Sequence, residues 1–227
     1  MIAPDDFTNF SSDGRLLQVE YAALAVNAGA PSLGIVGEDF VVIAADNSHN
    51  SLLYDEQGVH KVEPITEHIG MVYSGYKPDY NPILKFARKA AQEYLLNTGE
   101  PISVIELVKK IGRLMQEYTQ SARLRPFGVS LLICGWYENR PYLFQCNPPG
   151  QYLNLASAAV GVDHDKILKN MNKNWLNTEE RCCQFSLAQL KAVKGDLTRS
   201  NVEIGLCNKR GFRRLPSTEK FLTGNIC

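Results

Sequence analysis

The stretch Phe10-Ser11-Ser12-Asp13-Gly14-Arg15-Leu16-Leu17-Gln18-Val19-Glu20-Tyr21-Ala22, close to the N-terminus, says more about the fold than any other segment. It places an aromatic residue and a polar turn directly before a segment with helical periodicity. Asp13 is one of the residue types that favour a helix N-cap. Apolar side chains then recur at helical spacing, at Leu16, Val19, Ala23 and Val26. The pattern predicts an irregular tail over 1–9 and a helix within 13–28.

Further motifs follow this stretch along almost the whole chain. They are Tyr54-Asp55-Glu56, Val59-His60-Lys61-Val62-Glu63-Pro64-Ile65, Tyr73-Ser74-Gly75, Met115-Gln116-Glu117-Tyr118, Arg125-Pro126-Phe127-Gly128, Glu203-Ile204-Gly205 and Gly211-Phe212-Arg213-Arg214-Leu215. In order and spacing, this series resembles that of the α-type subunits of the 20S proteasome. The middle and late motifs are most similar to the α2 position of the eukaryotic ring, with α4 or another position as the alternative.

Composition excludes several classes of function. The 227 residues suit one domain, which we expect to span 1–227. Twenty-four basic residues balance twenty-four acidic ones, so the net charge gives no general attraction to nucleic acid or to an anionic membrane. No apolar run approaches the roughly 20 residues that a membrane-spanning helix needs. The cysteines and histidines show no zinc-ligand spacing, so we expect no metal and no cofactor.

The hydrophobic pattern alternates between blocks of strands and pairs of helices. Strands are predicted at 32–36, 40–45, 68–74, 128–136, 141–146 and 201–207, with two short strands inside 151–160. Helices are predicted around 83–94, from the capping-box residue Ser103 to Tyr118, and at 165–176 and 178–194. Paired helices between hairpin-forming strands indicate an α+β layered domain. The family resemblance sharpens this to the four-layer αββα sandwich of N-terminal-nucleophile hydrolases, with two mostly antiparallel sheets between helix pairs.

The sequence argues against catalysis. The β-type relatives cleave peptides with an N-terminal threonine, whose free amine activates its own hydroxyl. The corresponding position lies near Ala30, and the only hydroxyl close to it belongs to Ser32, directly after a proline. We interpret Asp46 and Lys61 as relics of an ancestral site and predict a catalytically silent subunit. The alternatives are an active N-terminal-nucleophile hydrolase and a freestanding binding protein on the same fold.

The resemblance implies a place in a larger particle and a location in the cytoplasm and nucleus. The expected partners are the other α subunits of a hetero-heptameric ring, the β-ring subunits, and the C-terminal tails of regulatory particles or activators. Lys61 matches a lysine that meets the terminal carboxylate of such a tail, and Glu20 and Gly14 match other pocket positions. The alternative for Lys61 is a solvated charge.

The resemblance also assigns roles to the first helix and the tail. Leu16, Val19 and Ala23 are expected to contact neighbouring ring elements, the alternative being ordinary packing on their own domain. The tail over 1–9 is expected to lie near the axial pore. Tyr21 keeps the family's gate tyrosine, whereas Ser12 replaces its turn proline, which loosens the backbone at this turn.

Overall fold

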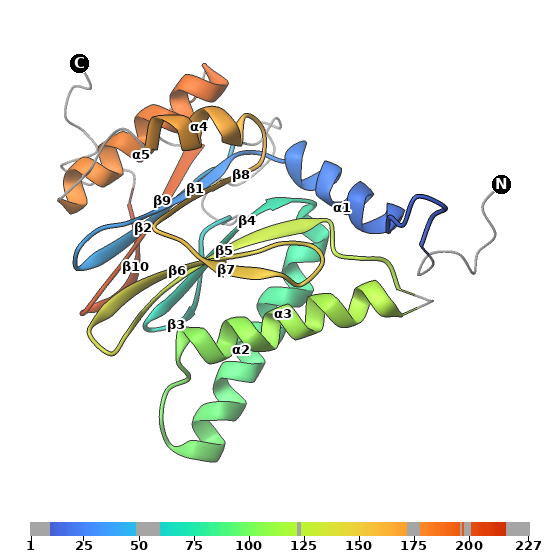
Figure 1. Cartoon of the computed structure of the whole chain (residues 1–227). Coiled ribbons are helices and arrows are strands. Elements are labelled where there is room, and N and C mark those ends of the chain that lie inside the picture. Colours follow the sequence, from blue (N-terminus) through green and yellow to red (C-terminus); the bar gives the residue numbers. More distant parts are fainter. Residues whose placement is uncertain are drawn as a thin grey trace, which may run out of the picture.

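The computed structural model describes residues 10–48, 60–121, 124–171, 178–195, 197 and 201–216. Two five-stranded sheets lie face to face, and every strand pairing is antiparallel (Figure 1). The first sheet has the order β10 (Gly211–Leu215), β9 (Val202–Asn208), β2 (Phe40–Asp46), β1 (Ser32–Val36) and β8 (Ser157–Val160). The second has the order β3 (Glu63–Thr66), β4 (Ile69–Gly75), β5 (Val129–Tyr137), β6 (Arg140–Cys146) and β7 (Tyr152–Asn154).

Helix pairs cover the outer faces of the two sheets. α2 (Lys77–Thr98) and α3 (Val104–Gln120) pack on the second sheet, and α4 (His164–Met171) and α5 (Glu179–Lys194) pack on the first. A third apolar cluster, which includes Ile43, Val72 and Leu132, fills the space between the sheets. These three cores confirm the predicted αββα sandwich.

β2 shows how the sequence produces these layers. All seven of its residues are buried. Because side chains alternate along a strand, Val41, Ile43 and Ala45 enter the core between the sheets. Phe40, Val42 and Ala44 enter the core under α4 and α5. A strand with both faces covered reads as a continuous apolar run rather than an alternating one.

Most predicted elements are confirmed to within one or two residues where the structure describes them. The capping residue Ser103 accepts a hydrogen bond at Oγ from the backbone N–H of Glu106, 3.2 Å away. The end of the helix predicted at 165–176 and the tail over 1–9 lie outside the described residues.

One prediction is wrong, and two strands were not predicted. Asp13 is not a helix cap, since α1 (Leu17–Asn27) begins four residues later, with Leu16 at the N-cap. Residues 11–15 instead close a turn, in which the backbone N–H groups of Gly14 and Arg15 bond to Ser11. β3 and β10 were not predicted as strands. Both are edge strands with exposed charged or proline residues, which hide the alternation that a strand normally shows.

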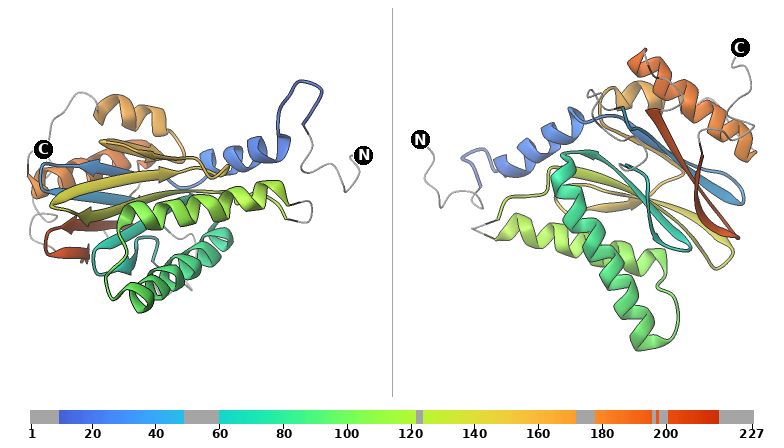
Figure 2. Two further views of the ribbon diagram at one scale, coloured as in Figure 1. Left: turned by 60° about the horizontal axis from the view of Figure 1, so that its bottom comes forward. Right: turned by 180° about the vertical axis from the view of Figure 1, so that it is seen from behind.

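α1 projects from one end of the sandwich, as Figure 2 shows in two views. Its C-terminal end reaches the sandwich at the start of β1. The turns that join β1 to β2, β5 to β6 and β9 to β10 lie at the opposite end, as the strand registers require. None of the helices in the described part of the chain combines the length and apolar character needed to cross a membrane.

Candidate functional site

The junction between α1 and β1 contains Ala30, near which the family resemblance implies the nucleophile position of the catalytic subunits. The hydroxyl of Ser74 donates to the carbonyl of Ala30 at 2.9 Å and to that of Val26 at 3.3 Å. Gly29 packs so closely on β4 that a Cβ there would lie 2.3 Å from the backbone nitrogen of Gly75. Ala30 has no side-chain hydroxyl or thiol, and its carbonyl accepts hydrogen bonds from Ser74 and Lys61.

Lys61 points into this junction and is buried, with 5% of its surface exposed. Its ammonium donates to the carbonyl oxygens of Ala30 at 2.9 Å and Asp46 at 3.1 Å. The Tyr73 ring centroid lies 5.5 Å from Nζ. Burial lowers the pKa of Lys61 to about 7. The structure thus excludes a solvated lysine at this position.

The carboxylate of Asp46 does not face Lys61. It pairs instead with the Lys194 ammonium at 2.5 Å and accepts from the backbone N–H of Ser48 at 2.8 Å. Burial alone would raise the pKa of Asp46, but the hydrogen bonds from Lys194 and Ser48 lower it on balance. The hydroxyl of Ser32 is buried and donates to the carbonyl of Tyr73 at 2.8 Å. The relic acid, lysine and hydroxyl are therefore each engaged in structural bonds.

Glu203 holds the segment that carries Lys61. Its Oε2 accepts the backbone N–H groups of Lys61 and Val62, each at 2.8 Å. Its Oε1 accepts from the Asn47 side chain at 2.7 Å and lies 3.0 Å from Nδ1 of His60. Because Glu203 is on β9 and residues 60–62 lead into β3, this carboxylate joins the two sheets at their Lys61 end.

Replacing Lys61 by methionine is expected to remove a pH dependence of stability. The pKa of Lys61 is about 7 in the folded chain against an ordinary 10.5, so between these values the folded chain binds fewer protons than the unfolded chain. Wild-type stability should therefore rise with pH, by about 3–4 kcal/mol between pH 7 and pH 10 relative to Lys61→Met. Denaturant unfolding of both proteins at pH 7 and pH 10 measures the difference. A difference independent of pH would contradict the buried, perturbed amine.

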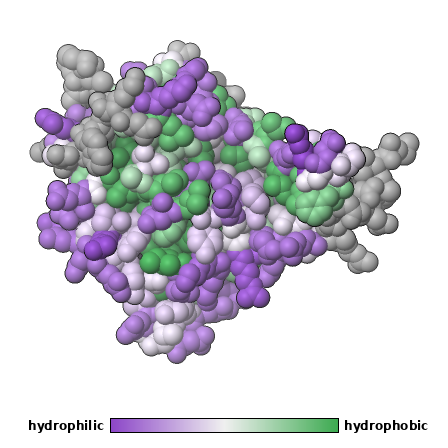
Figure 3. All heavy atoms as spheres, in the orientation of Figure 1, coloured by the Kyte–Doolittle hydropathy of each residue, from purple (hydrophilic) through white to green (hydrophobic). Residues whose placement is uncertain are grey.

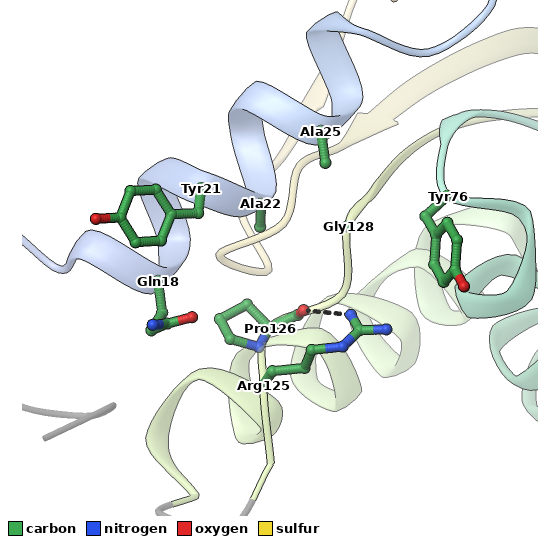
Figure 4. Close-up of a pocket in the computed structure, with 8 residues that line it drawn as sticks. All are labelled: Gln18, Tyr21, Ala22, Ala25, Tyr76, Arg125, Pro126 and Gly128. Carbon is green, nitrogen blue, oxygen red and sulfur yellow. Dashed lines mark hydrogen bonds between the residues drawn. The ribbon is translucent and has the colours of Figure 1, made fainter. Parts of the chain in front are cut away.

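A groove lies between α1 and segment 125–128 (Figure 4). Its volume is about 440 Å³. α1 contributes Gln18, Tyr21, Ala22 and Ala25, and the opposite wall contains Tyr76, Arg125, Pro126 and Gly128. The Tyr21 ring is half exposed, and in the view of Figure 4 it points away from the sandwich. This groove offers aromatic and guanidinium surface to a ligand or a neighbouring chain.

Asp79 fixes the wall of this groove. Its carboxylate accepts hydrogen bonds from both terminal nitrogens of Arg125 in a bidentate pair, with Nη1–Oδ2 and Nη2–Oδ1 distances of 2.5 and 2.6 Å. The same carboxylate accepts the backbone N–H of Gly128 at 2.8 Å. The Arg125 guanidinium lies 5.8 Å from the Tyr76 ring centroid. Segment 125–128 is thereby attached to the start of α2.

The structure does not bring the three predicted pocket residues together within one chain. Lys61 contacts the C-terminal end of α1, whereas Glu20 and Gly14 lie at or before its first turn. The 11 residues of the helix span about 16 Å. Glu20 is exposed near Arg15, with 3.8 Å between Oε1 and Nε. Gly14 adopts a left-handed conformation with φ 75° in the preceding turn. A pocket built from all three therefore requires two chains.

The predicted ring-contact and gate residues are at the surface. Leu16 and Val19 are half-buried, and Ala23, Tyr21 and Ser12 are exposed. Val19 and Ala23 line a second groove of about 340 Å³ beside α1, whose far wall is formed largely by residues 145–151. These side chains are available to a neighbour and are not used up in the chain's own core.

Sequence reasoning missed the structural roles of Asp79, Arg125, Glu203 and Ser74. Asp79 and Glu203 did carry a signal, since each is an acidic residue beside an otherwise apolar helix face or strand. Nothing in the sequence shows that Asp79 meets Arg125, 46 positions away. Among the described residues, no three His, Cys, Asp or Glu side chains gather as metal ligands would.

Comparisons with known proteins agree with this geometry. A family model described as proteasome subunit matches residues 26–207. The chain is 48% identical over 211 residues to proteasome subunit alpha type-2 of Drosophila melanogaster, covering 92% of this chain and 90% of that protein. It is 43% identical over 213 residues to proteasome subunit alpha type-2 of Caenorhabditis elegans, covering 92% and 91%. The protein of that name from Oryza sativa subsp. japonica is 38% identical over 216 residues, covering 93% and 92%. The chain therefore belongs to the proteasome subunit family, as an α-type member.

Proposed function

We propose that this chain is a non-catalytic structural subunit of the outer α ring of the 20S proteasome, acting in intracellular protein degradation. The observation that carries this proposal is the unpartnered apolar surface of α1. Membership of the family makes other proteasome subunits its partners. The α2 position is the ring place favoured by its relatives.

α1 is apolar around most of its circumference. Eight of the eleven residues in Leu17–Asn27 are apolar, yet only Ala22 and Val26 are buried. An exposed stripe follows the helix, with Leu17, Tyr21 and Leu24 exposed by 36%, 51% and 63%. Hydrophobic surface gathers over α1 in Figure 3. A helix that is apolar on most sides is normally covered on most sides, which supports burial of α1 in an assembly.

The finer roles follow the same reasoning. We place Leu16, Val19 and Ala23 in contacts with ring neighbours, and we place the chain in the cytoplasm and nucleus. Tyr21 lines the groove of Figure 4, which supports a gating role for this residue, and we assign Ser12, in the turn before α1, to the same role. We also assign the β ring and activator tails as partners.

Lys61 is proposed to receive the terminal carboxylate of an activator tail. Its ammonium has three N–H donors, of which two already bond to carbonyl oxygens, so an incoming carboxylate can accept the third. A carboxylate is the better acceptor, because a charge-assisted hydrogen bond is stronger than one to a neutral carbonyl. Docking thus couples to the α1–β1 junction through Ala30.

Changing Lys61 to alanine is expected to weaken docking of an activator tail peptide about tenfold or more, while the ring still assembles. Lys89→Ala serves as the control, because Lys89 makes only an exposed pair with Glu93 on α2. Titration of a labelled tail peptide against particles carrying each variant gives the affinities. Equal affinity of wild type and Lys61→Ala at this pocket would remove the role.

The ring proposal itself is tested by Leu24→Glu. Leu24 is exposed, so the isolated chain should keep its stability to within about 0.5 kcal/mol. Incorporation into the particle should fall several-fold, because a buried, unpaired charge opposes assembly. Tyr137→Glu is the control, since Tyr137 is exposed at the opposite end of the sandwich. Native mass spectrometry counts incorporation, and unchanged incorporation of Leu24→Glu would refute burial of α1.

A further inference from the structure

The end of the sandwich opposite α1 carries a cleft between hairpin turns. Its volume is about 430 Å³. Lys209, Arg210 and Arg213 come from the β9–β10 hairpin, and Asp39 and Trp136 from the turns of β1–β2 and β5–β6. We call this the tip cleft. It is separate from α1, from Lys61 and from the groove of Figure 4.

The fold sorts the basic run of the β9–β10 hairpin into two groups. Because side chains alternate along β10, Arg213 and Arg214 point to opposite faces. Arg214 reaches the carbonyl of Val62 at 3.4 Å, on the side of the second sheet. Lys209, Arg210 and Arg213 line the tip cleft and are exposed. In the described part of the chain, none of these three side chains forms an ion pair.

The turn that presents these cations is held in place. The side-chain oxygen of Asn208 accepts the backbone N–H of Arg210 at 2.9 Å. The amide nitrogen of Asn208 donates to Glu179 at 3.0 Å. Glu179 is the first residue of α5, where the positive end of the helix stabilises a negative charge. Glu179 keeps its negative charge, so the cleft lining holds three cations against the two carboxylates of Asp39 and Glu179, an excess of one positive charge.

We propose that the tip cleft binds an acidic segment of a partner protein through carboxylates that pair with Lys209, Arg210 and Arg213. The two arginines can each hold a carboxylate with two parallel hydrogen bonds. Asp39 on the opposite wall repels nearby negative charges. A peptide with spaced carboxylates can keep its charges away from Asp39, whereas nucleic acid, with a negative charge on every nucleotide, cannot. The chain's zero net charge also gives nucleic acid no general attraction.

The test uses the full chain and a fluorescein-labelled peptide of alternating glutamate and glycine. Fluorescence anisotropy should show binding that weakens several-fold when salt rises from about 50 to about 300 mM. The triple variant Lys209→Gln, Arg210→Gln, Arg213→Gln should bind at least about tenfold more weakly. The control triple variant is Lys85→Gln, Lys169→Gln, Lys191→Gln, which removes the same charge from other exposed positions and should bind as wild type.

A variant that should bind the peptide more tightly distinguishes a specific effect from loss of binding through misfolding. Asp39→Asn removes the repulsive wall charge and should tighten peptide binding several-fold. Equal weakening in both triple variants would assign the binding to net charge and overturn the proposal. Displacement of the peptide by a single-stranded oligonucleotide at lower concentration than by unlabelled peptide would overturn it in favour of nucleic acid. Leu24→Glu should bind the peptide normally, so this outcome is independent of the ring proposal.

Discussion

Replacing Gly75 by alanine is expected to prevent the chain from reaching a stable, ring-competent fold. Gly75 ends β4 with a backbone φ of +116°, a conformation that residues other than glycine rarely adopt. A Cβ there would lie 2.2 Å from the carbonyl oxygen of Gly128 and 3.1 Å from Cα of Val129. Both neighbours are backbone atoms, so neither can turn away.

The size of this effect follows from the packing around the glycine. Gly29 approaches the Gly75 nitrogen from α1, and the N–H of Tyr76 donates to the Gly128 carbonyl at 2.9 Å. Relief of the clash must therefore move β5 or the start of α2. We expect a loss of about 4 kcal/mol or more, a large part of the 5–15 kcal/mol typical of a domain.

Gly99→Ala is the matched control for Gly75→Ala. Gly99 also has positive φ, at +78°, but a Cβ there would meet nothing within 4 Å. This substitution should cost about 1 kcal/mol, for the left-handed conformation at the C-cap of α2 alone. Denaturant unfolding and incorporation into the particle compare the two variants. Equal costs would show that the close approach of Gly75 to β5 carries no energetic weight.

The local parts of this fold could be predicted from the sequence. The continuous apolar run of β2 and the cap at Ser103 depend only on neighbours in the chain. β10 could not be predicted, because its exposed arginines hide the strand alternation and its apolar contact across the sandwich, through Phe212, depends on a residue distant in the sequence. Phe212 packs over Gly70 and Gly205, two glycines from different sheets, where a Cβ would collide with its ring.

The candidate site also has parts that could be predicted from the sequence and parts that could not. The motifs around Lys61 and Tyr21 were visible in the sequence, and so was the absence of a nucleophile near Ala30. The burial of Lys61 could not be seen in the sequence, because the residues next to it in the chain do not show which carbonyl groups its ammonium contacts. The pairing of Asp46 with Lys194, 148 positions apart, is likewise a product of tertiary structure. Asp46 and Lys61 are thus held by contacts that their spacing in the sequence does not encode.

Replacing Glu203 by alanine is the second substitution from which we expect a large loss of stability. The Glu203 side chain is 13% exposed, and it satisfies the backbone N–H groups of Lys61 and Val62. Val62 is fully buried, so water cannot readily replace the carboxylate at its N–H. Each orphaned buried donor costs about 1–3 kcal/mol, which predicts a total of about 3–4 kcal/mol.

Glu63→Ala, on β3 in the other sheet, provides the control for Glu203→Ala. Glu63 forms a partly exposed pair with Arg88 at 2.9 Å and is expected to contribute no more than about 1 kcal/mol. Amide hydrogen exchange adds a local readout, because only Glu203→Ala should accelerate exchange at Lys61 and Val62. Unaltered protection of these two amides would mean that Glu203 does not join the sheets at the Lys61 end. Loss of protection with the strands otherwise intact would show that this carboxylate holds the segment that carries Lys61 beside the α1–β1 junction.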